Sequence, residues 1–408
     1  MDRIPSPVLQ LFEYFDQANL SWALIRPWQG LLSPDGDIDV LVARAELERV
    51  RGILVRAGYV PMPVGGKDIH AAKFDLESGS FFWVHVQSEL AAGQFKLGAE
   101  RLLGTVRRSP LPELDGDWLM WALLIRAVEK RKVPEKYRDR LAELGSKWRD
   151  GPTEPVDFVS RVGLDPRALV DAAIGRNWAY FESLPRQHSE QEVKAKSPLT
   201  TRLARIMRGL LDRRRQGLSV AVIGPDGAGK STLIEGLERT LPLRTRKIYM
   251  GLTSPKMVRA QSLRFPVLIF PAQVAVLWLQ YAKGLLYRAA GQIVLFDRYA
   301  LDGAVAAGTT LSAWARLARR IQRWVVPMPD LVLLLNVSGQ TMFERKGEYD
   351  ANTLEQWRCQ YLLLQGRISQ LATIDAEQPA DQVLRAAQEL LWNRLGDRAT
   401  SCAVPTAI

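Results

Sequence analysis

Nine consecutive residues, 224–232, have the types and spacing needed to hold a polyphosphate. They read Gly-Pro-Asp-Gly-Ala-Gly-Lys-Ser-Thr and fit the template G-x-x-x-x-G-K-[ST] at every fixed position. Glycines let backbone N–H groups approach phosphate oxygens without a Cβ in the way. The residues that we expect to contact the nucleotide are Gly224, Asp226, Gly227, Ala228, Gly229, Lys230, Ser231 and Thr232.

The elements on either side must position this loop. The apolar residues 218–223 before it are typical of a strand, and residues 233–238 after it can continue as a helix. The loop N–H groups and the helix N-terminus then converge on the same phosphates. Lys230 would reach the β- and γ-phosphates, and the Ser231 hydroxyl would bind Mg²⁺. The sequence therefore predicts binding of a nucleoside triphosphate together with Mg²⁺.

Two later apolar runs predict further strands of the same sheet. Residues 293–296 lead directly to Asp297 and Arg298, and residues 331–337 have the pattern of a strand that is buried on both faces. Strands separated by helices favour the α/β class, with a parallel sheet and helices on both faces. Ligands of such sheets gather at the carboxyl ends of the strands, so we expect Asp297 to lie beside the phosphate-binding loop.

The order of these motifs resembles that of thymidylate kinases. The shared segments are the phosphate-binding loop, Phe-Asp-Arg-Tyr at 296–299, Pro-Asp-Leu at 329–331, Glu-Arg-Lys-Gly-Glu at 344–348 and Ile-Asp-Ala at 374–376. Together they span roughly residues 218–395. The resemblance implies a P-loop fold and phosphoryl transfer from ATP to a nucleoside monophosphate.

The resemblance also implies roles for single residues. Asp226 would contact the sugar of the acceptor, Asp297 would lie near the metal and the acceptor phosphate, and Arg298 would grip that phosphate. A planar guanidinium suits this task because it binds two oxygens at once. The catalytic set would be Lys230, Asp297, Arg298 and Arg345, and the metal ligands would be Ser231 and Asp297.

A short lid at residues 344–350 follows from the same resemblance. Arg345 with Lys346 would meet the phosphoryl group in transfer, and Arg358 lies further along the chain. The loop after residues 374–376 would border the adenine. Phosphoryl transfer mainly requires charge neutralisation and in-line placement, so a loop lysine, a metal and lid cations are sufficient for it.

The acceptor is less well defined. Residues 251–291, which build the acceptor pocket in thymidylate kinases, contain Arg264 but are otherwise unusually apolar here. We place Arg264 with Asp226 and Arg298 in the acceptor site. The acceptor could be a different phosphorylated molecule, a sugar or a group on another macromolecule.

An earlier pair of carboxylates suggests a second site. Asp37 and Asp39 alternate along a predicted strand and therefore point to the same face, where a divalent cation would relieve their repulsion. Their surroundings, over roughly residues 7–103, resemble the nucleotidyltransferase superfold, in which paired aspartates hold the metals. The third carboxylate of that family has no clear equivalent, because residues 81–86 offer only His85, which we interpret as a packed residue.

Composition limits the classes of partner. The chain has 408 residues, a net charge of +11 and two cysteines, which favours several domains, an anionic partner and a reducing compartment such as the cytoplasm. Residues 185–216 hold nine Lys and Arg against three Asp and Glu, a net of +6, but without interleaved aromatics a solvated face is favoured over nucleic-acid binding. Residues 265–282 carry no charge, and their prolines and glutamines favour a buried helix over membrane contact.

We therefore predict an α+β nucleotidyltransferase-like domain at 1–104, a helical cap at 105–184, a basic linker and helix at 185–216, a thymidylate-kinase-like domain at 217–397 and a C-terminal tail at 398–408. The predicted function is ATP- and Mg²⁺-dependent phosphoryl transfer to a small phosphorylated acceptor. Two alternatives stay open: a nucleotide-gated binding or assembly module without turnover, and nucleotidyl transfer by Asp37 and Asp39. A homodimer is also left open.

Overall fold

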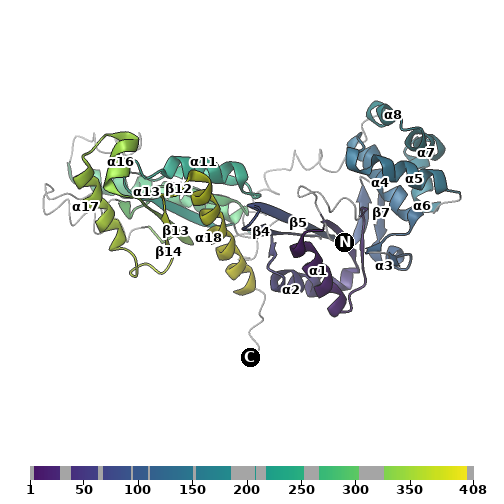
Figure 1. Ribbon diagram of the computed structural model, residues 1–408, viewed down its shortest axis with the longest axis horizontal. Coiled ribbons are helices and arrows are strands. Elements are labelled where there is room, and N and C mark those ends of the chain that lie inside the picture. The colour runs from purple at the N-terminus through teal and green to yellow at the C-terminus, as the bar shows by residue number, and fades with distance from the viewer. Residues whose placement is uncertain are drawn as a thin grey trace. The chain divides into compact units, whose positions relative to one another are not determined.

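The computed structural model describes residues 4–27, 38–62, 68–92, 95–108, 111–149, 153–184, 207, 217–251, 266–302 and 326–401. The chain forms two compact units, Met1–Arg202 and Leu203–Ile408, which are described separately below as the first and second units (Figure 1). The predicted linker and basic helix at 185–216 fall almost entirely outside the described residues, and the division into five segments stays a prediction.

A mixed seven-stranded sheet forms the centre of the first unit. Its spatial order is β3-β4-β5-β2-β1-β9-β8, and β2 pairs parallel with β5 and antiparallel with β1. The strands are β1 (Trp22–Leu24), β2 (Ile38–Val42), β3 (Val60–Pro61), β4 (Ile69–Asp75), β5 (Ser80–Gln87), β8 (Arg107–Arg108) and β9 (Pro112–Glu113). A separate hairpin joins β6 (Glu89–Ala92) to β7 (Phe95–Gly98).

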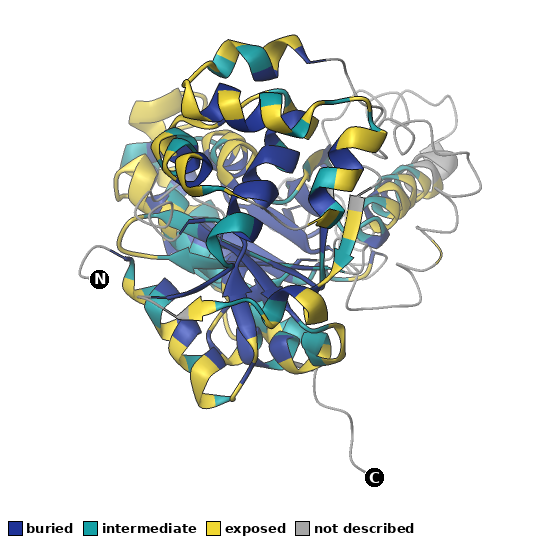
Figure 2. Ribbon diagram, turned by 90° about the vertical axis from the view of Figure 1, so that its right-hand side faces the viewer, coloured by how far each residue is buried: buried dark blue, intermediate teal, exposed yellow. Residues whose placement is uncertain are grey.

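Helices cover both faces of this sheet. Alternate residues of β2 divide between two cores: Val40 packs with α1 (Ser6–Gln17) and α2 (Leu47–Arg56), whereas Leu41 packs with the helices that follow the sheet. Figure 2 shows the strands as mostly buried and the outer faces of the helices as exposed. The later helices are α3 (Ala99–Leu103), α4 (Gly116–Lys130), α5 (Glu135–Lys147), α6 (Thr153–Arg161), α7 (Pro166–Ile174) and α8 (Trp178–Ser183).

A five-stranded, all-parallel sheet forms the second unit, with the order β11-β12-β10-β13-β14. Its strands are β10 (Ser219–Ile223), β11 (Thr245–Tyr249), β12 (Ile293–Asp297), β13 (Leu331–Asn336) and β14 (Leu371–Asp375). Its described helices are α11 (Lys230–Thr240), α13 (Pro266–Ala289), α16 (Gly339–Lys346), α17 (Ala351–Leu362) and α18 (Ala380–Ser401). The predicted α/β fold with a parallel P-loop sheet is confirmed.

Opposite faces of the parallel sheet receive different helices. Leu277 of α13 and Tyr361 of α17 pack with Val294 and Phe296 of β12 in one core. On the other side, α11 packs against α18, where Gly236 faces the Leu384 side chain and the Gln388 amide donates to the Thr240 hydroxyl at 2.8 Å.

The apolar stretch at 265–282 is helical, as predicted, but the prediction that it is buried is wrong. On α13 the described side chains of Trp278 and Leu279 are 45% and 69% exposed, whereas Leu277 is 1% exposed. Only one side of the helix contacts the sheet. Because apolar residues surround the whole helix, the sequence does not indicate which side that is. No helix in the described part of the chain is long and apolar enough to cross a membrane.

Candidate active site

The phosphate-binding loop joins β10 to α11, as the sequence predicts. Gly227 and Gly229 have φ angles of 90° and 92°, where a residue with a Cβ would be strained. A Cβ on Gly227 would also lie 2.8 Å from the backbone oxygen of Met342, so the loop packs closely against α16. Ser231 and Thr232 are exposed in the first turn of α11. The loop therefore offers backbone N–H groups and two hydroxyls at a helix N-terminus, which suits an anion.

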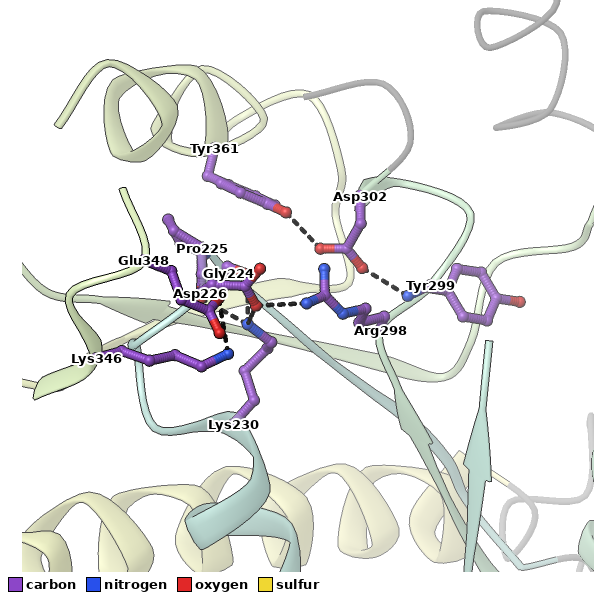
Figure 3. A network of polar contacts seen from close by, with 10 residues as sticks. All are labelled: Gly224, Pro225, Asp226, Lys230, Arg298, Tyr299, Asp302, Lys346, Glu348 and Tyr361. Carbon is purple, nitrogen blue, oxygen red and sulfur yellow. Dashed lines mark hydrogen bonds and ion pairs between the residues drawn. The ribbon is translucent and has the colours of Figure 1, made fainter. Parts of the chain in front are cut away.

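Lys230 is the buried cation of this loop. Its residue is 7% exposed, and Nζ donates to the backbone oxygens of Gly224 at 2.8 Å and Pro225 at 2.5 Å (Figure 3). Burial, reinforced by the nearby charge of Arg298, lowers the pKa of the Lys230 ammonium. Nζ also lies 3.6 Å from Oδ1 of Asp226, a longer contact than those with the two carbonyls. Lys230 can therefore turn to phosphate oxygens by giving up two neutral acceptors and one long ion pair.

Arg298 and Asp226 meet across two neighbouring strand ends. Val222 of β10 pairs with Asp297 of β12 in parallel register, and the Arg298 N–H donates to the Val222 oxygen at 3.1 Å. From there the Arg298 guanidinium points to Asp226, and Nη2 contacts Oδ1 (Figure 3). The prediction that the Asp-Arg motif and the phosphate-binding loop meet at the carboxyl edge of the sheet is confirmed.

Asp297 is a buried carboxylate that lies beside a lysine. It is 7% exposed, and its Oδ2 lies 3.2 Å from Nζ of Lys247, which is itself one-third exposed. The Asp297 carboxylate and the exposed Ser231 hydroxyl are oxygen donors of the kind that Mg²⁺ prefers, and phosphate oxygens would complete its shell. These two residues therefore fit the metal that the sequence predicts.

A cavity of about 430 Å³ lies next to the loop in the second unit. It is lined by Gly229 and Thr232 from the loop side, by Arg345 of α16, and by Ala376 and Gln378 after β14. The Arg345 Nη2 donates to the Ala376 oxygen at 3.2 Å. The predicted lid cation and the predicted adenine border therefore share one cavity with the phosphate-binding loop.

The other two lid cations have different surroundings. Lys346 is exposed and pairs with Glu348 at 3.1 Å. Arg358 lies on α17, where its Nε donates to the Asn336 side chain at 2.8 Å and Nη1 contacts Glu355. The structure thus singles out Arg345 as the lid cation on the cavity, while Arg358 ties α17 to the end of β13.

The acceptor side is only partly described. Arg264 lies outside the described residues. A Cβ on Gly251 would lie 2.4 Å from the Tyr249 hydroxyl and 2.7 Å from Cδ of Arg298, so these three residues are packed closely together. Among the described residues, Tyr249 and Gly251 therefore pack directly against Arg298, and neither belongs to a motif that the sequence makes recognisable.

A further carboxylate, Asp302, was also missed from the sequence. It is buried; Oδ2 accepts from the Tyr299 N–H at 2.6 Å and Oδ1 from the Tyr361 hydroxyl at 2.5 Å (Figure 3). Burial raises the pKa of Asp302, although the hydrogen bond from Tyr361 and the charges of Lys230 and Arg298 oppose the rise. The one sequence feature that could have indicated Asp302 is an acidic residue directly after the apolar residues 299–301.

The first unit contains a separate buried cluster around Asp39. Asp39 of β2 is opposite His85 of β5, and its residue is 2% exposed. Its Oδ1 lies 3.2 Å from His85 Nδ1 and accepts from the Gln87 amide at 3.1 Å, and its Oδ2 lies 2.5 Å from Arg26 Nε. His85 also stacks on His70, with ring centroids 4.0 Å apart. His85 is thus packed, as interpreted from the sequence, and it is also a polar partner of Asp39, which the sequence did not indicate.

These contacts set the charge states in the cluster. Burial opposes ionisation of Asp39, but the hydrogen bond from His85 and the charges of Arg26 and Arg126 together lower its pKa. Burial likewise opposes protonation of His85, but Asp39 and Asp68 together raise the pKa of the imidazole. The cluster is held as a mutually compensated set of charges.

The described residues of this cluster do not fit a two-metal centre. Asp37 lies outside them, and both Asp39 oxygens already contact nitrogen donors. Within the described part of the chain, no three His, Cys, Asp or Glu side chains come together as a metal site. A cation at Asp39 would have to displace Arg26, so we derive no reaction from this site.

Comparison with known proteins agrees with the geometry of the second unit. Residues 222–387 match the family model of thymidylate kinase. That segment contains the Asp-Arg motif and the lid, and it begins at the end of β10. One similar solved structure is a thymidylate kinase from Candida albicans, which is 18% identical, covers 44% of this chain and 93% of its own, and has a TM-score of 0.36. No curated protein matches the chain significantly.

Proposed function

We propose that the second unit transfers a phosphoryl group from ATP to a small phosphorylated acceptor, in the manner of a nucleoside monophosphate kinase. The observation that carries the proposal is the meeting of Lys230, Arg298 and Asp226 at two adjacent strand ends beside the phosphate-binding loop. The match of residues 222–387 to thymidylate kinase supports the same reaction class.

The reaction needs no nucleophile from the protein. An oxygen of the acceptor phosphate forms a bond to the γ-phosphorus while the bond from that phosphorus to the β–γ bridging oxygen breaks, which leaves ADP. Lys230 turns from the carbonyls of Gly224 and Pro225 to the β- and γ-phosphates. Arg298 exchanges its contact with Asp226 for the acceptor phosphate, and Asp226 is then free to accept from an acceptor hydroxyl.

The charge that spreads over the moving group is stabilised from two further directions. Arg345 reaches the phosphoryl group from the cavity side, where donors aimed at developing charge have their largest effect. Ser231 and Asp297 would hold Mg²⁺, which would supply further charge neutralisation when bound. Lys247 balances the Asp297 carboxylate in the free protein.

The test is turnover of ATP with Mg²⁺ across a panel of nucleoside monophosphates, thymidine monophosphate included, and sugar phosphates. ADP and pyrophosphate are followed separately in the wild type, in Lys230→Ala and in the control Lys136→Ala, whose lysine lies on the Tyr137 ring in the first unit. We expect acceptor-stimulated ADP release that falls by at least about 100-fold in Lys230→Ala and is unchanged in the control.

Other outcomes separate the alternatives. Binding of ATP without stimulation by any acceptor would contradict the kinase and favour a nucleotide-gated module. Release of pyrophosphate that persists in Lys230→Ala but is lost in Asp39→Asn would instead favour nucleotidyl transfer by the first unit.

A further inference from the structure

Asp302 is a buried carboxylate that the proposed reaction does not use. Its side chain and backbone close a short loop onto one residue: Oδ2 accepts from the Tyr299 N–H at 2.6 Å, and the Asp302 N–H donates to the Tyr299 oxygen at 3.0 Å. The backbone bond closes a turn, and the carboxylate caps the Tyr299 N–H as the acidic half of a capping box does, which fixes the path of the chain as it leaves the strand. Asp302 therefore determines the geometry of the turn directly after Arg298.

Arg298 needs such support. Its φ angle is 67°, a left-handed conformation that is uncommon for a residue with a long side chain. The backbone N–H on one side of the strained residue is bonded to Val222 of β10, and the N–H on the other side, that of Tyr299, is bonded to Asp302. These two bonds aim the guanidinium at the phosphate-binding loop.

The second oxygen of Asp302 connects this turn to a distant part of the sequence. Oδ1 accepts from the hydroxyl of Tyr361, which is 4% exposed at the end of α17 (Figure 3). Helix α17 is in turn fixed to α16: the Gly339 N–H donates to Glu355 Oε2 at 2.9 Å, and a Cβ on Gly339 would lie 2.2 Å from the Ala351 oxygen. Because backbones touch there, the two helices form one stiff pair.

The same helix pair carries Arg345 to the nucleotide cavity. We propose that Asp302 is a positioning residue that holds Arg298 toward the acceptor and, through Tyr361, couples it to the helix pair that carries Arg345. This inference rests on the proposed kinase function and adds to it a physical link between the nucleotide side and the acceptor side. Binding of ATP at the Arg345 cavity then favours the Arg298 orientation that binds the acceptor, and the reverse holds by linkage.

The test uses Tyr361→Phe, which keeps the ring and removes only the hydroxyl, and Asp302→Asn, which keeps the size and removes the charge. The matched control is Tyr287→Phe, because the Tyr287 ring on α13 packs against Arg246 and Lys283. The probe is thymidine 5′-monophosphate, or the member of the panel above that stimulates ADP release most. Its dissociation constant is measured by calorimetry with and without a non-hydrolysable ATP analogue.

In the wild type and in Tyr287→Phe we expect the analogue to tighten acceptor binding by at least about fivefold. In Tyr361→Phe that factor falls toward one, while the affinity for the analogue alone is unchanged. In Asp302→Asn the acceptor KM rises about tenfold with a smaller change in kcat, because uniform binding is lost. Far-UV circular dichroism and thermal unfolding show whether each variant is folded.

Three results would overturn the proposal. If the ATP analogue did not tighten acceptor binding in the wild type, no coupling would exist, even in an active kinase. A wild-type factor retained in Tyr361→Phe would show that the hydroxyl does not transmit it. A wild type without acceptor-stimulated ADP release would remove the proposed function and with it the acceptor role of Arg298.

Discussion

The two units each bury a cluster of opposite charges, and the clusters differ in what holds each charge. In the first unit, Asp39 is 2% exposed and both of its oxygens contact side-chain nitrogens. In the second, Lys230 is held by two backbone carbonyls and by a long contact of 3.6 Å with Asp226, and the Arg298–Asp226 pair is 26% and 24% exposed. The charges of the first cluster compensate one another in a buried place, whereas the cations of the second can exchange their partners for a ligand.

The difference shows how to recognise a site among buried charges. A fully compensated buried pair mainly sets which structure forms, because removing either partner leaves an unpaired charge away from water. Cations held by neutral or partly exposed partners lose little when a phosphate replaces those partners. The predictions below test this contrast through stability in the first unit and activity in the second.

The largest effect is expected for Arg26→Ala. It leaves the Asp39 carboxylate buried without its main cation, so the first unit should lose about 3–5 kcal/mol of unfolding free energy. Hydrogen exchange of peptides from β2 and β5 reports this loss. The double variant Arg26→Met with Asp39→Asn is the control, since it removes both charges and should recover much of the stability. Equal exchange in wild type and Arg26→Ala would contradict the structural role of the pair.

Arg298→Ala should affect activity strongly and stability little, which is the opposite of what we expect for Arg26→Ala. We expect acceptor-dependent turnover to fall by roughly 100- to 1,000-fold, because a donor aimed at the reacting phosphates is lost. Unfolding free energy should change by no more than about 1 kcal/mol, since the ion pair with Asp226 is partly solvated. Arg394→Ala is the control, because Arg394 lies on α18 and donates to the backbone oxygen of Asp330. An Arg298→Ala protein with normal turnover but poor stability would reverse the comparison.

Stability of the first unit should depend on pH in both directions. The lowered pKa of Asp39 adds stability above the normal value of 3.8, which is lost as pH falls through the folded-state pKa. The raised pKa of His85 adds stability below the normal value of 6.5, which is lost as pH rises through the folded-state pKa. Stability from this pair is therefore greatest between these two normal values.

Denaturant unfolding across pH, followed by the same exchange peptides, measures that profile. His85→Gln should remove the alkaline decline and leave the acid one. A decline at high pH that persists in His85→Gln would assign it to another group.

The smallest expected effect is that of Mg²⁺ alone on the first unit. Because the described partners of Asp39 already occupy both of its oxygens, added MgCl₂ without nucleotide should shift the unfolding temperature of this unit by less than about 1 °C. The same salt with ATP should stabilise the second unit. Mg²⁺-dependent protection of β2 that disappears in Asp39→Asn would restore the metal-dependent alternative.

Local motifs made the second unit predictable. The loop at 224–232 was recognisable because its fixed positions are restricted, and the φ angles at Gly227 and Gly229 are strained for any residue with a side chain. Buried strands such as β12 and β13 were equally clear, as continuous apolar runs of the right length. Together they fixed the sheet edge at which Asp297 and the loop meet.

Contacts between distant segments could not be predicted in the same way. The Asp302–Tyr361 hydrogen bond joins residues 59 positions apart, and Arg26 reaches Asp39 from the end of another strand. Neither pair leaves a trace in local spacing or periodicity. The end of helix α17 at Leu362 is another such feature, because it is followed by a turn containing Gly366 at a φ of 78°. Tertiary packing decided these features.

Helix α18 bears on the order in which the chain folds during synthesis. It packs against α11, the helix that begins at Lys230, and its residues Asp381, Val383 and Leu384 line the cavity beside the phosphate-binding loop. The wall of that cavity is therefore completed by residues about 150 positions after the loop, whereas the first unit ends before the loop is made and can fold as soon as it leaves the ribosome. A chain truncated before α18 would carry an intact phosphate-binding motif without that wall of the cavity beside it.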